Sequence, residues 1–194
     1  MTRVVNTRPQ KLPLITVIGE GITEQYYFKH IRTILGFRYI VKPYYFETTS
    51  IKDMDRKIKE VVEGQGIAIC VFDTDVAERN EKEQIKLRKL KQKYVHKGNV
   101  IFCDSLPSIE FWFLLHYRNT NRYFNNALTL TSALRHYLPG YQKTTHFLEQ
   151  ERWVRDMCAD GKLQTAAQRA MAFGETGPSY SNIYKAFDVF DGRN

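Results

Sequence analysis

The chain has 194 residues, which is enough for one substantial hydrophobic core and short for two complete ones. Its composition of 43% hydrophobic and 26% charged residues is typical of soluble globular proteins. The formal net charge of +8 favours a polyanionic partner, with nucleic acid ahead of an acidic membrane surface.

Membrane and disulfide-rich classes fit the chain poorly. No apolar run approaches the roughly 20 residues that span a bilayer, and the polar N-terminus lacks the apolar segment of a signal peptide. The three cysteines Cys70, Cys103 and Cys158 are odd in number and far apart, so neither a zinc site nor a disulfide framework is indicated. We therefore expect a cytoplasmic protein that does not bind membranes.

The first part of the chain alternates between predicted strands and helices. Strands are expected at 14–18, 38–46, 67–72 and 100–103, and helices at 24–35, 53–63 and 78–97. Thr23 is the expected N-cap of the first helix. Pro43 cannot donate to a ladder, so the second strand is expected at a sheet edge or bent. The six consecutive apolar residues of 67–72 predict a central strand that is buried on both faces.

After Pro107 the pattern becomes helical, with helices expected at 107–117, 126–138, 146–159, 162–172 and 180–190. The alternating strand–helix order over residues 14–117 predicts a doubly wound α/β domain with a central parallel sheet. We expect residues 1–120 to form this core and residues 121–194 to form an all-helical extension that packs on it as one unit.

Three carboxylates stand where predicted strands end. Glu20 follows the first strand, and Asp73 and Asp75 follow the third. Ligands of open α/β sheets sit beyond the carboxyl ends of the strands, so we expect these acids to converge there. Two or three carboxylates, completed by water and phosphate oxygens, suit Mg²⁺ or Mn²⁺. The pattern predicts a metal site for phosphate chemistry.

Other interpretations of these acids remain open. Glu20 fits a solvated loop glutamate, and Asp73-Thr-Asp75 fits a turn that caps the next helix. Glycosyltransferases also carry Asp-x-Asp motifs, whereas aspartyl-phosphate phosphatases place theirs after the first strand. A dinucleotide-binding fingerprint fits poorly because Glu24 stands where its third glycine belongs.

Glu110 is the only charged residue between Leu106 and Leu115. A helix this apolar is buried, and a carboxylate within it needs a counter-charge or a metal. The alternative is a first-turn acid that backbone donors satisfy. His116, at the end of the same segment, has the pattern of a core histidine more than that of a ligand.

Two sets of lysines are candidates for phosphate contacts. Lys143 is a candidate phosphate or transition-state cation, although a lone loop lysine is usually solvent-facing. A stripe at helical spacing would follow a phosphate backbone or form a solvated face: Lys82, Lys86, Lys89, Lys93 and Lys97.

Glu20 after the first strand with Asp73-x-Asp75 after the third resembles the Toprim domain of topoisomerases, primases and several nucleases. Four segments together resemble an RloB-like (AbiLii-type) protein, in order and with suitable spacing. They are Gly19-Glu-Gly-Ile-Thr-Glu-Gln-Tyr-Tyr-Phe28, Phe72-Asp-Thr-Asp75, Ser105-Leu-Pro-Ser-Ile-Glu-Phe-Trp-Phe-Leu-Leu-His116 and Tyr141-Gln-Lys143. Leu106 and Ile109 depart from the family's usual residues, but Glu110 is kept.

The resemblance implies a Toprim-like (Rossmann-like) core with Glu20, Asp73 and Asp75 as metal-site acids. It also implies Glu110, His116, Tyr141 and Lys143 as motif positions near that site. RloB-like proteins occur with restriction-modification and abortive-infection loci, beside a gene for an ABC/AAA-type ATPase. We therefore expect an Mg²⁺- or Mn²⁺-dependent DNA or RNA nuclease of antiphage defence, with Glu110 as a further ligand or proton acceptor and Lys143 stabilising the transition state. The alternative is a non-catalytic nucleic-acid-binding or regulatory subunit of the ATPase, and homo-oligomerisation is left open.

Overall fold

One mixed sheet organises the computed structural model, which describes residues 12–42, 50–75 and 80–192. Its strand order is β2-β1-β3-β4-β5. The first four strands are parallel, and β5 runs antiparallel to β4. The strands are β1 (Ile15–Gly19), β2 (Ile40–Lys42), β3 (Ile67–Asp73), β4 (Val100–Leu106) and β5 (Tyr180–Ser181). The predicted α/β class with a mostly parallel central sheet is confirmed.

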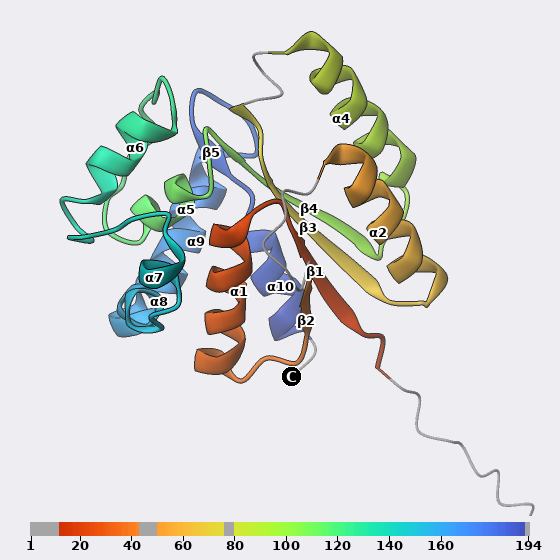
Figure 1. The fold of residues 1–194 in the computed structure, drawn as a ribbon, viewed down its shortest axis with the longest axis horizontal. Helices are drawn as coiled ribbons and strands as arrows, with labels where there is room; N and C mark the ends of the chain where they lie inside the picture. The colour runs from red at the N-terminus through yellow and green to blue at the C-terminus, as the bar shows by residue number, and fades with distance from the viewer. Residues whose placement is uncertain (1–11, 43–49, 76–79, 193–194) are drawn as a thin grey trace, which may run out of the picture.

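Helices cover both faces of the sheet, so the molecule has three layers (Figure 1). On one face lie α2 (Ile51–Glu63) and α4 (Glu81–Tyr94). The other face carries α1 (Ile22–Leu35), α5 (Glu110–Leu115) and α10 (Tyr184–Asp191). Four further helices and a 3₁₀ turn pack around α5 and α1: α6 (Ala127–Leu134), α7 (Thr145–Leu148), α8 (Arg152–Cys158), η1 (Ala159–Gly161) and α9 (Lys162–Phe173).

The central strand β3 explains why both faces need a cover. Ile67, Ile69 and Val71 enter the core beneath α1, α5 and α10. The alternate residues Ala68, Cys70 and Phe72 enter the core beneath α2 and α4. Successive side chains of a strand point to opposite faces, so an uninterrupted apolar run requires burial on both. The prediction of a central, doubly covered strand is confirmed.

The order of strands reverses between β1 and β3. The chain leaves β1 through α1 towards β2 on one side, then returns through α2 on the opposite face to β3 on the other side of β1. This switch point is where open α/β sheets hold their ligands, because the two diverging connections leave a crevice at the carboxyl ends of the strands. Glu20 follows β1 and Asp73 ends β3, so both stand at the switch point.

Two predicted boundaries around the acids are wrong. Helix α1 begins at Ile22 with Gly21 as N-cap, two residues earlier than the expected cap at Thr23, because the Glu24 side chain accepts the Gly21 backbone N–H (2.9 Å). Strand β4 continues to Leu106 because it pairs with both β3 and β5, and α5 begins only at Glu110 instead of residue 107. The peptide bond between Leu106 and Pro107 is cis.

The prediction of an all-helical extension after residue 120 is also wrong. Tyr180 and Ser181 form β5, and the helix expected at 180–190 begins at Tyr184. Without β5, the outer edge of β4 would leave its backbone N–H and C=O groups unpaired. The β5 strand supplies their hydrogen-bond partners. The helix expected at 146–159 is divided into α7 and α8. The division into a core of residues 1–120 and an extension stays a prediction.

The expected edge strand is confirmed at Ile40–Lys42, where β2 pairs with β1 at the end of the sheet. Residues 38 and 39 of that predicted strand precede β2 without joining the sheet. Pro43 and residues 44–46 lie outside the described residues, as do positions 78 and 79 of the predicted lysine-rich helix. Within the described ranges, no helix combines the length and the apolar character needed to cross a membrane.

A buried carboxylate joins α4 to the β4 edge of the sheet. Asp104 is 3% exposed, and its Oδ2 accepts hydrogen bonds from Lys91 Nζ (2.7 Å) and Tyr180 Oη (3.1 Å). Its Oδ1 accepts a hydrogen bond from Asn182 Nδ2 (2.9 Å). A charged acceptor with three donors is well satisfied, so this network holds β5 and α4 in place.

Replacing Asp104 with alanine should destabilise the fold by about 2–4 kcal/mol, because buried donors lose their acceptor. Equilibrium unfolding in urea measures the loss. The matched control is Glu60→Ala, which breaks the exposed Arg56–Glu60 pair on α2 and should change stability by no more than about 0.5 kcal/mol. Equal losses in the two variants would contradict a structural role for the Asp104 network.

Candidate metal-binding acid cluster

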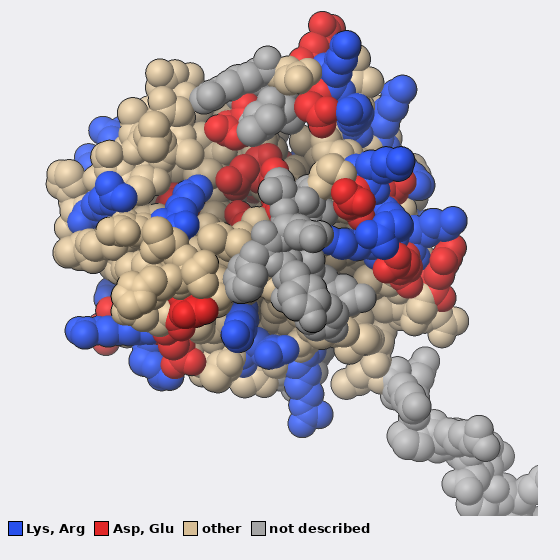
Figure 2. All heavy atoms as spheres, in the orientation of Figure 1, with Lys and Arg blue, Asp and Glu red and all other residues tan. Residues whose placement is uncertain are grey.

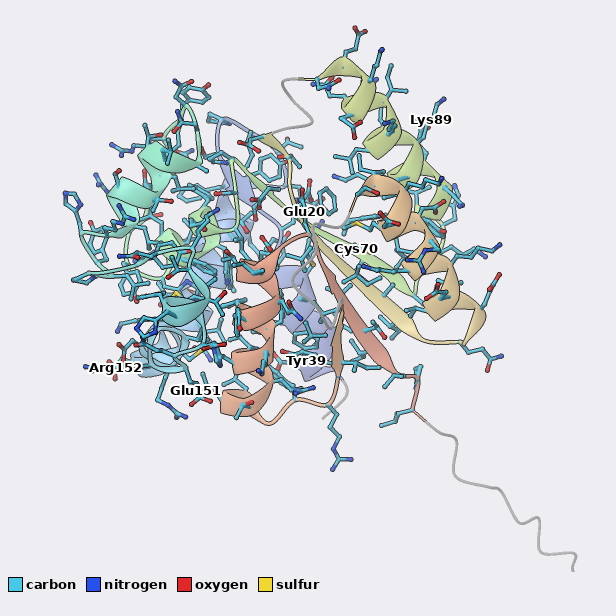
Figure 3. All side chains as sticks on the ribbon, viewed as in Figure 1. Glu20, Tyr39, Cys70, Lys89, Glu151 and Arg152 are labelled. Atoms are coloured by element: carbon cyan, nitrogen blue, oxygen red, sulfur yellow. The ribbon has the colours of Figure 1, made fainter. Side chains whose placement is uncertain are left out.

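Glu20 is fixed across the switch point by two hydrogen bonds. Its backbone N–H donates to the Val71 carbonyl (3.0 Å), which continues the β1–β3 ladder by one residue. Its Oε2 accepts a hydrogen bond from the Asp73 backbone N–H (2.9 Å). Glu20 is partly exposed at the carboxyl ends of the strands, near the centre of the view in Figure 3. The ends of the first and third strands therefore lie side by side, as predicted, and are joined by these two hydrogen bonds.

The Asp73-Thr-Asp75 turn is held by its central residue. Thr74 is buried, and its backbone N–H and Oγ1 both donate to the Ser105 carbonyl of β4 (2.9 and 3.1 Å). Asp75 lies beyond this anchor, close enough to Glu20 for its charge to raise the pKa of that acid. Asp73 Oδ1 accepts the Ile109 N–H (2.8 Å), which ties the turn to the start of α5.

Glu110 is fully buried, and the expected counter-charge is Lys143. The Lys143 Nζ lies 3.0 Å from Glu110 Oε1, which also accepts a hydrogen bond from Tyr141 Oη (2.6 Å). Ser108 Oγ donates to Glu110 Oε2. The donors are therefore side chains, and the backbone-satisfied alternative is wrong. Tyr141 is buried and supports Glu110, whereas Lys143 is 42% exposed and reaches the site from the surface.

A fifth acid, Glu24, belongs to the same cluster and was not predicted. It is 4% exposed in the first turn of α1, where it accepts the Gly21 N–H. Burial, and then the nearby charges of Glu110 and Glu20, raise the pKa of Glu24 to about 7. The sequence signal was present, because a glutamate three residues after an N-cap is half of a capping box. With the N-cap predicted at Thr23, Glu24 would be the first helical residue and not the third, so the capping-box pattern does not appear.

The pKa values of several acids in the cluster are raised by burial and by the charges of their neighbours, and Lys143 offsets only part of this effect. Burial raises the pKa of Asp73 well above its usual range, and the charges of Glu24 and Glu110 raise it further while Lys143 lowers it. Burial also raises the pKa of Glu20, against the hydrogen bond from Asp73, and the Asp75 charge adds to the rise. Figure 2 shows carboxylates gathered in a hollow near the centre of the visible face. Such crowding favours a divalent cation.

The donor set fits a hard cation, although the cluster is not closed around one. Within the described residues, no three His, Cys, Asp or Glu side chains are arranged to hold a common metal ion. Glu20 Oε1 and Asp73 Oδ2 make no hydrogen bond with the described residues, so each acid keeps one carboxylate oxygen for a ligand. Mg²⁺ usually takes one or two protein carboxylates and fills its shell with water and substrate oxygens. An open pair of acids meets that requirement.

His116 lies in the core and away from the cluster's contacts. Its Nδ1 lies 2.9 Å from the Trp112 carbonyl, and its ring packs edge-on against the Trp112 indole. Burial lowers the pKa of His116 to about 4, and the charges that act on it are Arg169 and Lys162. Within the described residues, no hydrogen bond or charge interaction links His116 with the acids. These contacts agree with the interpretation of His116 as a core histidine. They give no support for a role of His116 at the acid cluster.

The five lysines of the predicted stripe are exposed, and α4 carries four of them. Helix α4 connects two parallel strands and runs back between them (Figure 1), so its N-terminal turn, which contains Lys82, follows the carboxyl end of β3, and Lys97 stands before the start of β4. Lys93 pairs with Asp55 and Lys86 with Glu83 (both 2.7 Å). Figure 3 places Lys89 on the outer side of α4, away from Glu20. Nucleic-acid binding by this stripe stays a prediction.

The family model of the RloB-like proteins matches residues 15–186, so the chain belongs to the RloB-like family. The matched segment includes every acid of the cluster, together with Tyr141 and Lys143. Searches of the curated proteins and of the solved structures gave no match.

Glu24→Gln should remove part of a pH dependence of stability in the metal-free protein. The pKa of Glu24 rises from 4.5 to about 7 on folding, so the folded state holds a proton that the unfolded state releases. This contribution is fully present below pH 4.5 and disappears as the pH rises to about 7. The difference corresponds to about 3 kcal/mol at most.

Glutamine mimics the protonated acid, so Glu24→Gln should be more stable than the wild type at pH 8 and similar to it at pH 4.5. Urea unfolding in the presence of a chelator measures both values. Glu63→Gln, at an exposed position on α2, is the control and should follow the wild type. A Glu24→Gln variant with the wild-type pH slope would show that Glu24 ionises normally.

Proposed function

We propose that this RloB-like protein is a metal-dependent phosphodiesterase, a DNA or RNA nuclease with a Toprim-like core that acts in antiphage defence. The observation that carries the proposal is the acid cluster at the switch point of the sheet, where the Asp73 backbone N–H at the end of β3 donates to the carboxylate of Glu20 after β1. The net charge of +8 supports a polyanionic substrate for a site that is itself acidic.

Glu20, Asp73 and Asp75 would hold Mg²⁺ or Mn²⁺, and Glu110 stands behind them. The bound ion would neutralise the scissile phosphate and lower the pKa of an attacking water. The protein supplies placement: the Ile109 N–H orients Asp73, and the Asp73 N–H orients Glu20. Since a backbone donor occupies one oxygen of each carboxylate, the other oxygen would bind the ion.

Lys143 would contact a phosphate oxygen and stabilise the charge that develops there. Its position depends on Glu110, because the 3.0 Å ion pair holds the ammonium group beside the acids. Burial opposes the charge of Lys143, but Glu110 and then Asp73 raise its pKa above the usual range. The lysine therefore stays protonated at neutral pH, as a phosphate-binding cation must.

An ATPase encoded nearby is the proposed partner. RloB-like proteins occur beside such a gene, and no Gly-x-x-x-x-Gly-Lys phosphate-binding motif occurs in these 194 residues. Any dependence on ATP would therefore come from the partner. If the protein cleaves nothing, the same site would serve a regulatory subunit that binds nucleic acid for the ATPase.

Asp73→Asn and Glu20→Gln should each reduce cleavage by at least about 100-fold, because each removes a charge that would hold the metal. The assay uses plasmid, single-stranded DNA and RNA in Mg²⁺ or Mn²⁺, with and without the partner ATPase. Glu63→Gln is the control and should keep full activity. A wild-type protein that is inert in every mixture would exclude the nuclease.

Metal binding is measured separately from activity. Mn²⁺ at about 100 times its dissociation constant should stabilise the wild type by about 2.7 kcal/mol. The Asp73→Asn, Asp75→Asn double variant should show little stabilisation, and without metal it should be more stable than the wild type because like charges are removed. Calorimetric titration with Mn²⁺ gives the affinity. Unchanged Mn²⁺ binding in the double variant would place the metal elsewhere.

A further inference from the structure

A cavity of about 530 Å³ opens beside the acid cluster. Asp75 forms one side of it, and the end of β4 and the segment before α6 form the others. The lining residues are Asp75, Leu106, Pro107, Tyr123, Phe124, Asn125 and Asn126. The volume lies within the roughly 300–1,000 Å³ of pockets that take small molecules. We call it the Tyr123 pocket.

The Tyr123 pocket and the acids share the same stretch of chain. Pro107 lines the pocket, while Ile109, two residues later, donates its N–H to Asp73 (2.8 Å). Glu110, the next residue, pairs with Lys143. A group in the pocket would therefore stand next to a phosphate at the acids, and the two could belong to one nucleotide.

The wall that carries Tyr123 is anchored on both sides. Phe124 is 4% exposed and packs edge-on against Phe111 of α5, with its ring centroid 6.2 Å away. The Arg122 guanidinium covers the Phe124 ring at 4.5 Å. Asn126 Oδ1 accepts the Thr129 N–H (2.9 Å) and so caps α6. With Phe124 turned inward, the neighbouring Tyr123 side chain is turned outward and is 66% exposed.

The chemistry of the lining selects a neutral planar group. Among the residues that the structure describes, those that line the pocket include one carboxylate and no Lys, Arg or His, which disfavours a second phosphate there. An aromatic face suits a base, because every nucleobase has a π-face on which it can stack. The Asn126 Oδ1 is used by the helix cap, which leaves its Nδ2 group to donate to the edge of a base.

We propose that the Tyr123 pocket binds an unpaired nucleobase of the strand whose phosphate lies at the acid cluster. The inference rests on the proposed function and names its substrate class: single-stranded or flipped-out nucleotides, rather than intact duplex. A base that is stacked and paired inside a duplex is not accessible to a pocket and enters it only after unpairing. Tyr123 stacks on the base, and Asn126 donates to its edge.

Binding tests the pocket without cleavage. The probes are fluorescent 12-nucleotide single strands of DNA and RNA and their matched duplexes, measured by anisotropy in a chelator with full-length protein. Tyr123→Ala should weaken single-strand binding by about tenfold, the value of one stacked base. Asn126→Asp keeps the cap of α6 and removes the amide donor, so it should also weaken binding. Tyr137→Ala changes a 40% exposed tyrosine outside the pocket and should bind as the wild type does.

A second arm removes one base at a time from the single strand. At one position the wild type should lose affinity, and Tyr123→Ala should lose nothing further, because both changes remove the same contact. Adenosine and cytidine monophosphates should compete only at much higher concentration than the strand. A monophosphate that binds as tightly as the strand would overturn the assignment to a polynucleotide.

The inference fails if Tyr123→Ala and Asn126→Asp bind single strands within twofold of the wild type, or if duplex binding falls by the same factor. Either result would leave the proposed nuclease intact, since cleavage depends on the acids. Conversely, absence of cleavage together with base-dependent binding would contradict the proposed nuclease activity and support base binding by the Tyr123 pocket. Asp73→Asn, which should bind strands without cleaving them, separates the two outcomes in the presence of metal.

Discussion

The structure depends on an electrostatic imbalance at the carboxyl edge of the sheet. Burial raises the pKa values of Glu20, Glu24 and Asp73, and the charges of neighbouring acids raise them further. Lys143 lowers all three pKa values and forms an ion pair with Glu110. Like charges in a poorly hydrated site oppose folding unless protons or a cation neutralise them. A site that tolerates this cost is typical of functional positions in proteins, where ionisation is tuned for a ligand.

The surrounding fold keeps the acids together. Trp112 Nε1 donates to Tyr27 Oη (2.6 Å) and locks α5 against α1, so Glu110 and Glu24 cannot separate. Thr74 ties the end of β3 to β4, and the Glu20 backbone joins β1 to β3. Rigid elements therefore hold the acidic side chains, as a preorganised site requires. The switch-point position and the charge pattern of the acids are the features on which the proposed phosphodiester chemistry rests.

In the proposed function, different surfaces would contact different parts of the substrate. The acids and Lys143 would contact one phosphate, and the Tyr123 pocket beside Asp75 would take a neutral ring. Helix α4 carries lysines along its outer side, although Asp55 and Glu83 already pair with two of them. Backbone contacts confer affinity without selectivity, whereas a ring-binding pocket distinguishes unpaired from paired nucleotides. Selectivity for strand type would therefore come from the Tyr123 pocket.

The sequence by itself determined the parallel sheet, the buried central strand and the strand-end positions of Glu20, Asp73 and Asp75, because hydrophobic periodicity and turn residues act locally. It also indicated that Glu110 needs a counter-charge. Tertiary structure alone decided that Lys143 supplies it, that Glu24 joins the acids, and that Tyr180–Ser181 pairs with β4. These outcomes depend on contacts between residues distant in the chain, such as Glu110 with Tyr141 or Asp104 with Asn182, and no local pattern encodes which partners meet.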